Sequence, residues 1–112
     1  MTGNYAGDEK RKHARYHWTT SVVLLKDDTS SAGEIQNISM GGILVKSSLP
    51  LKYGDEVTAE FMVPKLDKKI KAKCAVRWMM GEETIGLSFV GLKAIETWAV
   101  SQLVRQLANE QG

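Results

Sequence analysis

The chain has 112 residues, of which 43% are hydrophobic and 25% are charged, a composition that fits one globular domain with a modest core. The formal net charge of +2 is far less basic than that of a typical nucleic-acid-binding domain, so no nucleic-acid partner is expected. The single cysteine, Cys74, excludes an internal disulfide and a cysteine metal cluster, and we expect it to be a small buried hydrophobe.

The apolar stretches are too short for a membrane span, which needs roughly 20 residues. Residues 1–10 also lack the apolar core of a signal peptide. We therefore expect a cytoplasmic protein without membrane insertion.

The N-terminal part of the chain is predicted to be a flexible segment at residues 1–8 followed by a basic arm at residues 9–17. The arm contains Arg11-x-x-x-Arg15, and Lys10 lies directly before the first arginine. A guanidinium group can bind O6 and N7 of guanine, stack on a base or pair with phosphate oxygens. The two arginines therefore offer two contacts to an anionic guanine nucleotide.

Short segments of alternating or apolar character follow the arm and predict about six strands. They lie at residues 18–26, 33–38, 42–46, 57–63, 70–78 and 85–89. A loop is expected at residues 27–31, where Asp, Thr and Ser are concentrated. Several short strands with close turns and no helix between them favour an antiparallel barrel or sandwich over a parallel sheet.

The turn after the second predicted strand contains Asn37-x-Ser39-x-x-Gly42. Asn37 and Ser39 provide short hydrogen-bonding side chains, and Gly42 lets a ligand or a backbone approach closely. The adjacent glycines, Gly41 and Gly42, would permit positive φ angles. These residues are candidates for a ligand site.

The strand at residues 70–78 has one apolar face, which ends at Trp78. Its other face is expected to be solvated and carries Lys69, Lys71, Lys73 and Arg77. Trp78 could pack inside the barrel or stack on a base at its mouth, and core packing is the favoured interpretation. The lysines are interpreted as a solvated face, with an acidic partner as the alternative.

The last segment, residues 92–109, changes to the helical period and predicts an amphipathic helix. Its apolar stripe is formed by Leu92, Ile95, Ala99, Val100, Leu103, Val104 and Leu107. Trp98 lies off this stripe and is expected to be partly exposed. An exposed tryptophan is typical of a protein-binding surface.

The two motifs together resemble the signature of the PilZ domain family, R-x-x-x-R followed by [DN]-x-S-x-x-G. Val76-Arg77-Trp78 and Gly86-Leu87-Ser88-Phe89 also resemble late strands of that family, and the likeness covers residues 9–110. The resemblance implies a mostly β fold, a six-stranded antiparallel barrel at residues 18–91 with a C-terminal α-helix. It also implies binding of cyclic di-GMP, with the arginine arm folding over the ligand.

The predicted ligand site combines the motif residues with three secondary candidates. The primary residues are Arg11, Arg15, Asn37, Ser39 and Gly42, and the secondary ones are Lys10, Gly41 and Trp78. No catalytic pairing of residues and no metal-ligand cluster is evident in the sequence, so we expect neither an enzyme nor a cofactor. Cyclic di-GMP would then be the ligand of a sensor.

A sensor without an output domain is expected to act as a freestanding adaptor on an unidentified effector protein. The family resemblance suggests motility or exopolysaccharide machinery. Two alternatives remain open. One is a protein-interaction barrel that binds no nucleotide, and the other is a small barrel that binds single-stranded nucleic acid through its aromatic residues and lysines.

Overall fold

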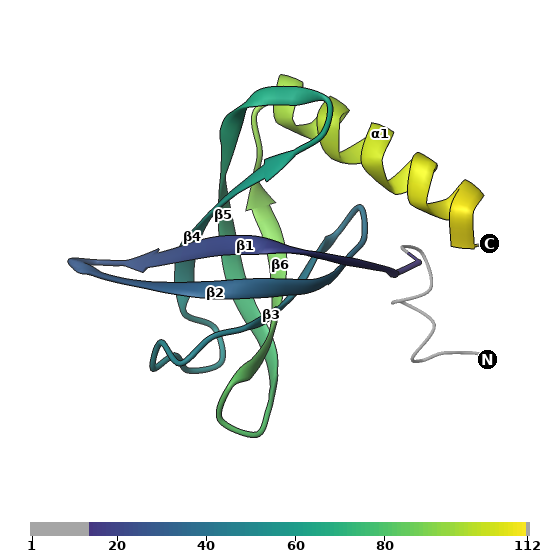
Figure 1. Cartoon of the computed structure of the whole chain (residues 1–112). Coiled ribbons are helices and arrows are strands. Elements are labelled where there is room, and N and C mark those ends of the chain that lie inside the picture. Colours follow the sequence, from purple (N-terminus) through teal and green to yellow (C-terminus); the bar gives the residue numbers. More distant parts are fainter. Residues whose placement is uncertain (1–13, 112) are drawn as a thin grey trace.

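The computed structural model describes residues 14–111 and contains six β-strands followed by one α-helix. The elements are β1 (Tyr16–Lys26), β2 (Thr29–Ile38), β3 (Gly42–Lys46), β4 (Glu56–Val63), β5 (Leu66–Met80), β6 (Thr84–Gly91) and α1 (Ala94–Gln111). Neighbouring strands pair antiparallel and close into a barrel in the order β1-β2-β3-β6-β5-β4 (Figure 1). The predicted six-stranded antiparallel barrel with a C-terminal helix is confirmed.

The turn between β1 and β2 is shorter than the loop predicted at residues 27–31. Lys26 pairs with Thr29, so that only Asp27 and Asp28 close the hairpin. Asp27 adopts a φ of 55°, a left-handed conformation that suits a two-residue turn and that aspartate tolerates. The polar residues from Thr29 onward therefore belong to β2, and the prediction of a loop there is wrong.

The barrel interior is filled by the side chains that alternate inward along the strands. Its most deeply buried large members include Leu24, Ile35, Ile38, Ile43, Phe61, Ile70 and Ile85. β1 pairs with β4 only over Val23–Leu25, and the two strands diverge beyond this stretch. The ring of Trp18 on β1 meets Phe61 edge to face, with ring centroids 6.3 Å apart. This pair fills the space where the strands diverge.

Helix α1 packs against β1, β4 and β5 with one face (Figure 1). The predicted stripe is confirmed at Ala99, Val100, Leu103 and Leu107, which are buried. It is wrong at Ile95, whose side chain is 53% exposed. No helix within residues 14–111 has the length and apolar character that crossing a membrane requires.

Glu96 takes the place in the first turn of α1 that was assigned to an apolar side chain. Its carboxylate is only 5% exposed and accepts hydrogen bonds from the backbone N–H groups of Lys93 (2.9 Å) and Lys71 (3.2 Å). The first bond caps the helix, and the second ties the helix to β5. Because Glu96 makes these two bonds, the helix is turned so that Ile95 faces solvent.

Irregularities in strand pairing change which side chains face outward. The register shifts between Ile35 and Asn37 on β2 and between Val76 and Trp78 on β5. In both cases one extra residue is inserted, as in a β-bulge, so the alternation of inward and outward side chains is interrupted. Both shifts lie beside the site described next.

Candidate functional site

The loop between β2 and β3 is shaped by the hydroxyl of Ser39. Its Oγ accepts hydrogen bonds from the N–H groups of Gly41 (3.1 Å) and Gly42 (3.2 Å), and the backbone N–H of Ser39 donates to the carbonyl of Gly42 (2.9 Å). The residue is 3% exposed. Ser39 therefore holds the loop closed, which is a structural use of the hydroxyl that was predicted to contact a ligand.

Gly41, at the end of this loop, and Gly42, at the start of β3, allow two strands to lie close together. Among the described glycines, positive φ angles occur at Gly54 and Gly81, so the freedom to adopt a positive φ is not used at Gly41 or Gly42. A Cβ at Gly42 would collide with the carbonyl oxygen of Leu87 on β6, because β3 and β6 lie too close there for any side chain. The carbonyl of Gly41 accepts from the N–H of Phe89 (2.8 Å) and fixes the same edge.

Arg15 and Asn37 bring the two motifs of the sequence into contact. The Nη1 of Arg15 donates a hydrogen bond to the Oδ1 of Asn37 over 3.1 Å. The register shift in β2 places Asn37 where it can receive this bond. Desolvation lowers the pKa of the Arg15 guanidinium, although the residue remains exposed. Among residues 14–111, no carboxylate lies within ion-pair distance of Arg15.

Arg77 and Trp78 lie across from this loop on β5. Trp78 is 37% exposed, so the favoured interpretation of core packing is wrong. The extra residue in β5 ends the inward alternation after Val76 and leaves both Arg77 and Trp78 on the outer surface. The indole lies over Gly86 on β6, where an added Cβ would overlap the ring.

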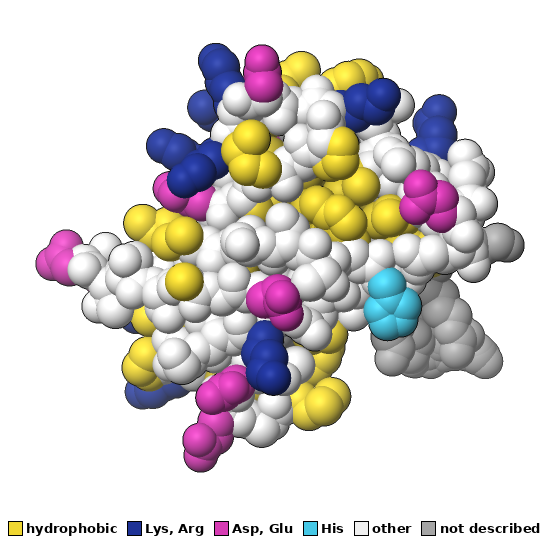
Figure 2. Space-filling model, in the orientation of Figure 1, with side chains coloured by type: hydrophobic (Ala, Val, Ile, Leu, Met, Phe, Trp, Pro, Cys, Tyr) yellow, Lys and Arg dark blue, Asp and Glu magenta, His cyan; other side chains and the backbone are white. Residues whose placement is uncertain are grey.

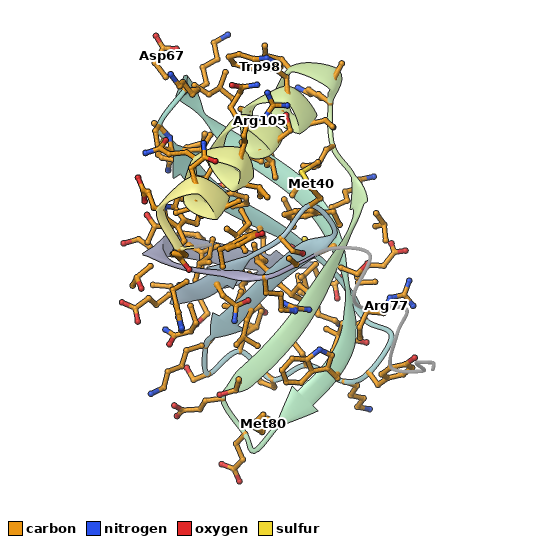
Figure 3. All side chains as sticks on the ribbon, turned by 90° about the vertical axis from the view of Figure 1, so that its right-hand side faces the viewer. Met40, Asp67, Arg77, Met80, Trp98 and Arg105 are labelled. Atoms are coloured by element: carbon orange, nitrogen blue, oxygen red, sulfur yellow. The ribbon has the colours of Figure 1, made fainter. Side chains whose placement is uncertain are left out.

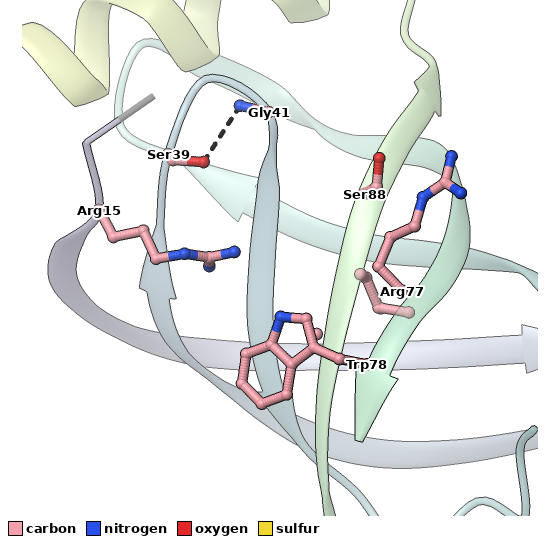
Figure 4. Close-up of a pocket in the computed structure, with 8 residues that line it drawn as sticks. Arg15, Ser39, Gly41, Arg77, Trp78 and Ser88 are labelled. Carbon is pink, nitrogen blue, oxygen red and sulfur yellow. Dashed lines mark hydrogen bonds between the residues drawn. The ribbon is translucent and has the colours of Figure 1, made fainter. Parts of the chain in front are cut away.

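A pocket of about 410 Å³ lies between these groups. Its lining comes from β5, β6, the β2–β3 loop and the residue before β1, and consists of Arg15, Ser39, Gly41, Arg77, Trp78, Gly86, Leu87 and Ser88. Figure 4 shows Arg15 and Arg77 on opposite sides of the pocket, with the indole of Trp78 between them. The volume is within the range of small-molecule sites, and the side chains offer two cations and one aromatic surface.

Four of the predicted site residues line this pocket, namely Arg15, Ser39, Gly41 and Trp78. Asn37 is connected to it through Arg15, and Gly42 begins β3 directly after the Ser39 loop. Lys10 and Arg11 lie outside the described residues. Their ligand contacts remain predictions, as do those of the other six.

Arg77 and Ser88 also line the pocket, although neither was among the predicted site residues. Arg77 was assigned to the solvated face of its strand, and nothing in the strand pattern indicated that this part of the face borders a hollow. The pair of Trp78 and Gly86 on neighbouring strands was the available signal, since a glycine leaves room for an indole outside the barrel. Within residues 14–111, no group of three His, Cys, Asp or Glu side chains is arranged to hold a metal ion.

The chain matches the family model of the PilZ domain over residues 9–109. A comparison with curated protein sequences finds no match. Several solved structures have similar folds. The inhibitor of motility MotI/DgrA of Bacillus subtilis is 19% identical with a TM-score of 0.75, and the match covers 91% of this chain and 53% of that one. The PilZ domain of CeSA from a cellulose-synthesizing bacterium is 19% identical with a TM-score of 0.65, covering 85% of this chain and 98% of that one.

Proposed function

This chain belongs to the PilZ domain family, and we propose that it is a cyclic di-GMP receptor that acts as an adaptor on a partner protein. The observation that carries the proposal is the pocket in which Arg15, Arg77 and Trp78 surround one hollow beside the Ser39 loop. Two guanidinium groups and an aromatic ring suit a ligand with two phosphates and two guanine bases. PilZ domains are binding domains, and we propose no catalytic step and no cofactor.

Each part of the pocket has a distinct role in the proposed complex. Arg15 and Arg77 pair with phosphate oxygens or with the O6 and N7 edge of guanine. The indole of Trp78 stacks on a base, and the Ser39 loop provides a rigid wall. Arg11, with Lys10 before it, adds a further cationic contact to the ligand from the arm. Because these contacts are charge-assisted and partly exposed, the affinity should fall as salt concentration rises.

Arg15 is well suited to bind an anion. Its guanidinium is partly desolvated, and within the described part of the chain its polar side-chain partner is the neutral amide of Asn37. A phosphate would replace the lost hydration with charge-assisted hydrogen bonds. Asn37 would hold the guanidinium in position without neutralising it.

The proposed adaptor role rests on family membership. The chain spans about half the length of MotI/DgrA, a protein described as an inhibitor of motility. The second similar structure is the PilZ domain of CeSA from a cellulose-synthesizing bacterium. We propose a cytoplasmic role in motility or exopolysaccharide production, in which ligand binding orders the arginine arm and changes the surface presented to an effector.

Isothermal titration calorimetry with cyclic di-GMP tests this function, with GTP and a short single-stranded oligonucleotide as control ligands. We expect selective binding of cyclic di-GMP and a loss of at least about tenfold in affinity for Arg15→Ala. Arg105→Ala is the matched control because Arg105 is an exposed arginine on α1, outside the pocket. Equal binding by Arg15→Ala and wild type would overturn the proposed site, and binding of the oligonucleotide alone would favour a nucleic-acid-binding barrel.

A further inference from the structure

We propose that the end of the molecule formed by the β4–β5 hairpin and the start of α1 binds an acidic segment of a partner protein that also carries a large apolar side chain. We name this surface the basic end. Its cationic side chains are Lys65, Lys68, Lys69, Lys71, Lys93 and Arg105. The proposal deepens the adaptor role proposed above, on which it rests for its biological purpose, but the binding itself requires no nucleotide.

The two parts of the basic end are joined by Glu96. Its carboxylate accepts from the backbone of Lys71 on β5 and of Lys93 at the start of α1, which holds these two residues at one place. Figure 3 shows Asp67 of the hairpin and Trp98 of the helix at the same end of the molecule. The charges are therefore presented by rigid elements around the first turns of α1.

An apolar surface lies among these charges. Trp98 is 47% exposed and Ile95 is 53% exposed, as α1 turns its buried residues, such as Leu103, toward the barrel. The predicted partial exposure of Trp98 is confirmed. A half-exposed tryptophan flanked by cationic residues is the arrangement that forms binding hot spots in protein interfaces, where an aromatic anchor is surrounded by polar contacts.

Charge is distributed unevenly over the molecule. In Figure 2, Lys and Arg side chains gather over the upper part, around the β4–β5 hairpin and α1, whereas acidic side chains predominate below. The turns away from the basic end carry the carboxylates of Asp27, Asp28, Glu82 and Glu83. A net charge of only +2 therefore conceals a strongly cationic end. The positive electrostatic potential of these side chains steers an acidic partner toward that end.

The cations of the basic end are not neutralised within the described chain. Within residues 14–111, the ion pair closer than 4.0 Å is that of Lys26 with Asp27. It lies at the β1–β2 turn, away from the basic end. Asp67 is exposed among the lysines, and Glu60 is the backbone partner of Lys71 in the β4–β5 pairing, so the surface is not uniformly positive. Carboxylates from a partner would supply the missing charge.

The chemistry favours a protein over the other anionic partners. The basic end carries lysines and only one arginine. Lysines suit the carboxylates of a mixed protein surface, whereas the bidentate contacts typical of nucleic-acid binding are made by arginine. Trp98 and Ile95 are each about half buried, so neither side chain projects as a membrane anchor would. Asp67 at the hairpin would also face an anionic headgroup layer, which is unfavourable.

The test uses short random peptides displayed on phage, selected on the immobilised full chain without nucleotide. A peptide from the enriched pool is then labelled, and its affinity is measured by fluorescence anisotropy. We expect enriched sequences to combine Asp or Glu with a large apolar residue. Trp98→Ala should lower the affinity for the labelled peptide at least about tenfold. The matched control is Tyr53→Ala, which removes an aromatic side chain that is 70% exposed in the β3–β4 loop.

A paired charge reversal, Lys68→Glu with Lys71→Glu, should lower the affinity for the same peptide, and the loss relative to wild type should grow as the salt concentration is lowered. The control Lys52→Glu should show no such loss. Circular dichroism verifies that each variant remains folded. Three results would each overturn the proposal. The first is enrichment of peptides that lack carboxylates, and the second is an equal loss of peptide affinity in Trp98→Ala and Tyr53→Ala. The third is Trp98-dependent binding to phosphatidylglycerol vesicles without enrichment of any peptide. Because no nucleotide is present, this result is independent of whether cyclic di-GMP binds.

Discussion

The Nη1 of Arg15 donates a 3.1 Å hydrogen bond to the Oδ1 of Asn37, and this bond joins the two motifs that stand far apart in the sequence. An arginine side chain has many rotamers, and ordering it on ligand binding costs conformational entropy. A bond that already orients the guanidinium reduces this cost. Asn37 is thus expected to act on ligand affinity mainly through Arg15.

Asn37→Ala should therefore weaken cyclic di-GMP binding by about three- to tenfold, the range expected for one net hydrogen bond. In an Arg15→Ala background the same substitution should have little further effect, because the two residues act as one unit. Calorimetry on the four proteins of this cycle measures the coupling. Asn109→Ala, at an exposed position of α1, is the control. Full additivity would show instead that Asn37 contacts the ligand independently.

Trp78→Ala should lower ligand affinity by roughly 1–3 kcal/mol, the usual contribution of a base stacked on an aromatic ring. Trp78→Phe should retain part of this contribution, since it keeps an aromatic face. Trp98→Ala deletes an indole from another surface and should leave cyclic di-GMP affinity unchanged. If Trp78→Ala lowered thermal stability strongly but left affinity unaltered, the indole would be packing on Gly86 without contacting the ligand.

The barrel was predictable because its signals are local. Alternation of apolar and polar residues identified the strands, and the change to a helical period identified α1. The same alternation failed at Trp78, because an extra residue in β5 reverses the faces without altering composition. Pairing partners determine where such a residue is inserted, and a single strand does not contain that information.

The site was predictable only where a motif names its residues. Arg15 and Ser39 were identified in this way and line the pocket. Arg77 was missed because its role depends on the hollow between β5 and the Ser39 loop, which exists only once the barrel closes. Ile95 was misplaced for a related reason. A buried carboxylate, Glu96, makes two backbone hydrogen bonds and sets the rotation of α1, whereas hydrophobicity alone favoured the isoleucine.

Gly42→Ala should destabilise the fold by about 2 kcal/mol or more, because the new Cβ would meet the backbone of β6, which cannot move aside as a side chain can. Gly91→Ala is the control on the same barrel, since the nearest atom to its Cβ, in Lys73, would be 3.4 Å away. Thermal and urea denaturation compare the two. Equal stability of both variants would indicate that β3 and β6 separate easily, and that Gly42 has another role.

Cys74 should make stability fall at alkaline pH. Burial raises the pKa of its thiol to about 12, from an ordinary value of 9.0. Between these values the unfolded chain releases a proton that the folded chain retains, so the free energy of unfolding decreases as pH rises. The thiol should contribute a loss of about 1.4 kcal/mol between about pH 7 and about pH 10. Below the unfolded pKa it should contribute no pH dependence.

Urea denaturation of wild type and Cys74→Ala across this range measures that contribution, because the other titrating groups are common to both proteins and cancel in the difference. The variant starts from a lower stability owing to the lost packing of a fully buried side chain, so the slope of the difference with pH, not its offset, is decisive. Native wild-type protein should also react slowly with a thiol reagent until urea unfolds it. Parallel pH profiles for the two proteins, together with rapid thiol labelling of the native state, would show that the barrel opens around β5 and exposes Cys74.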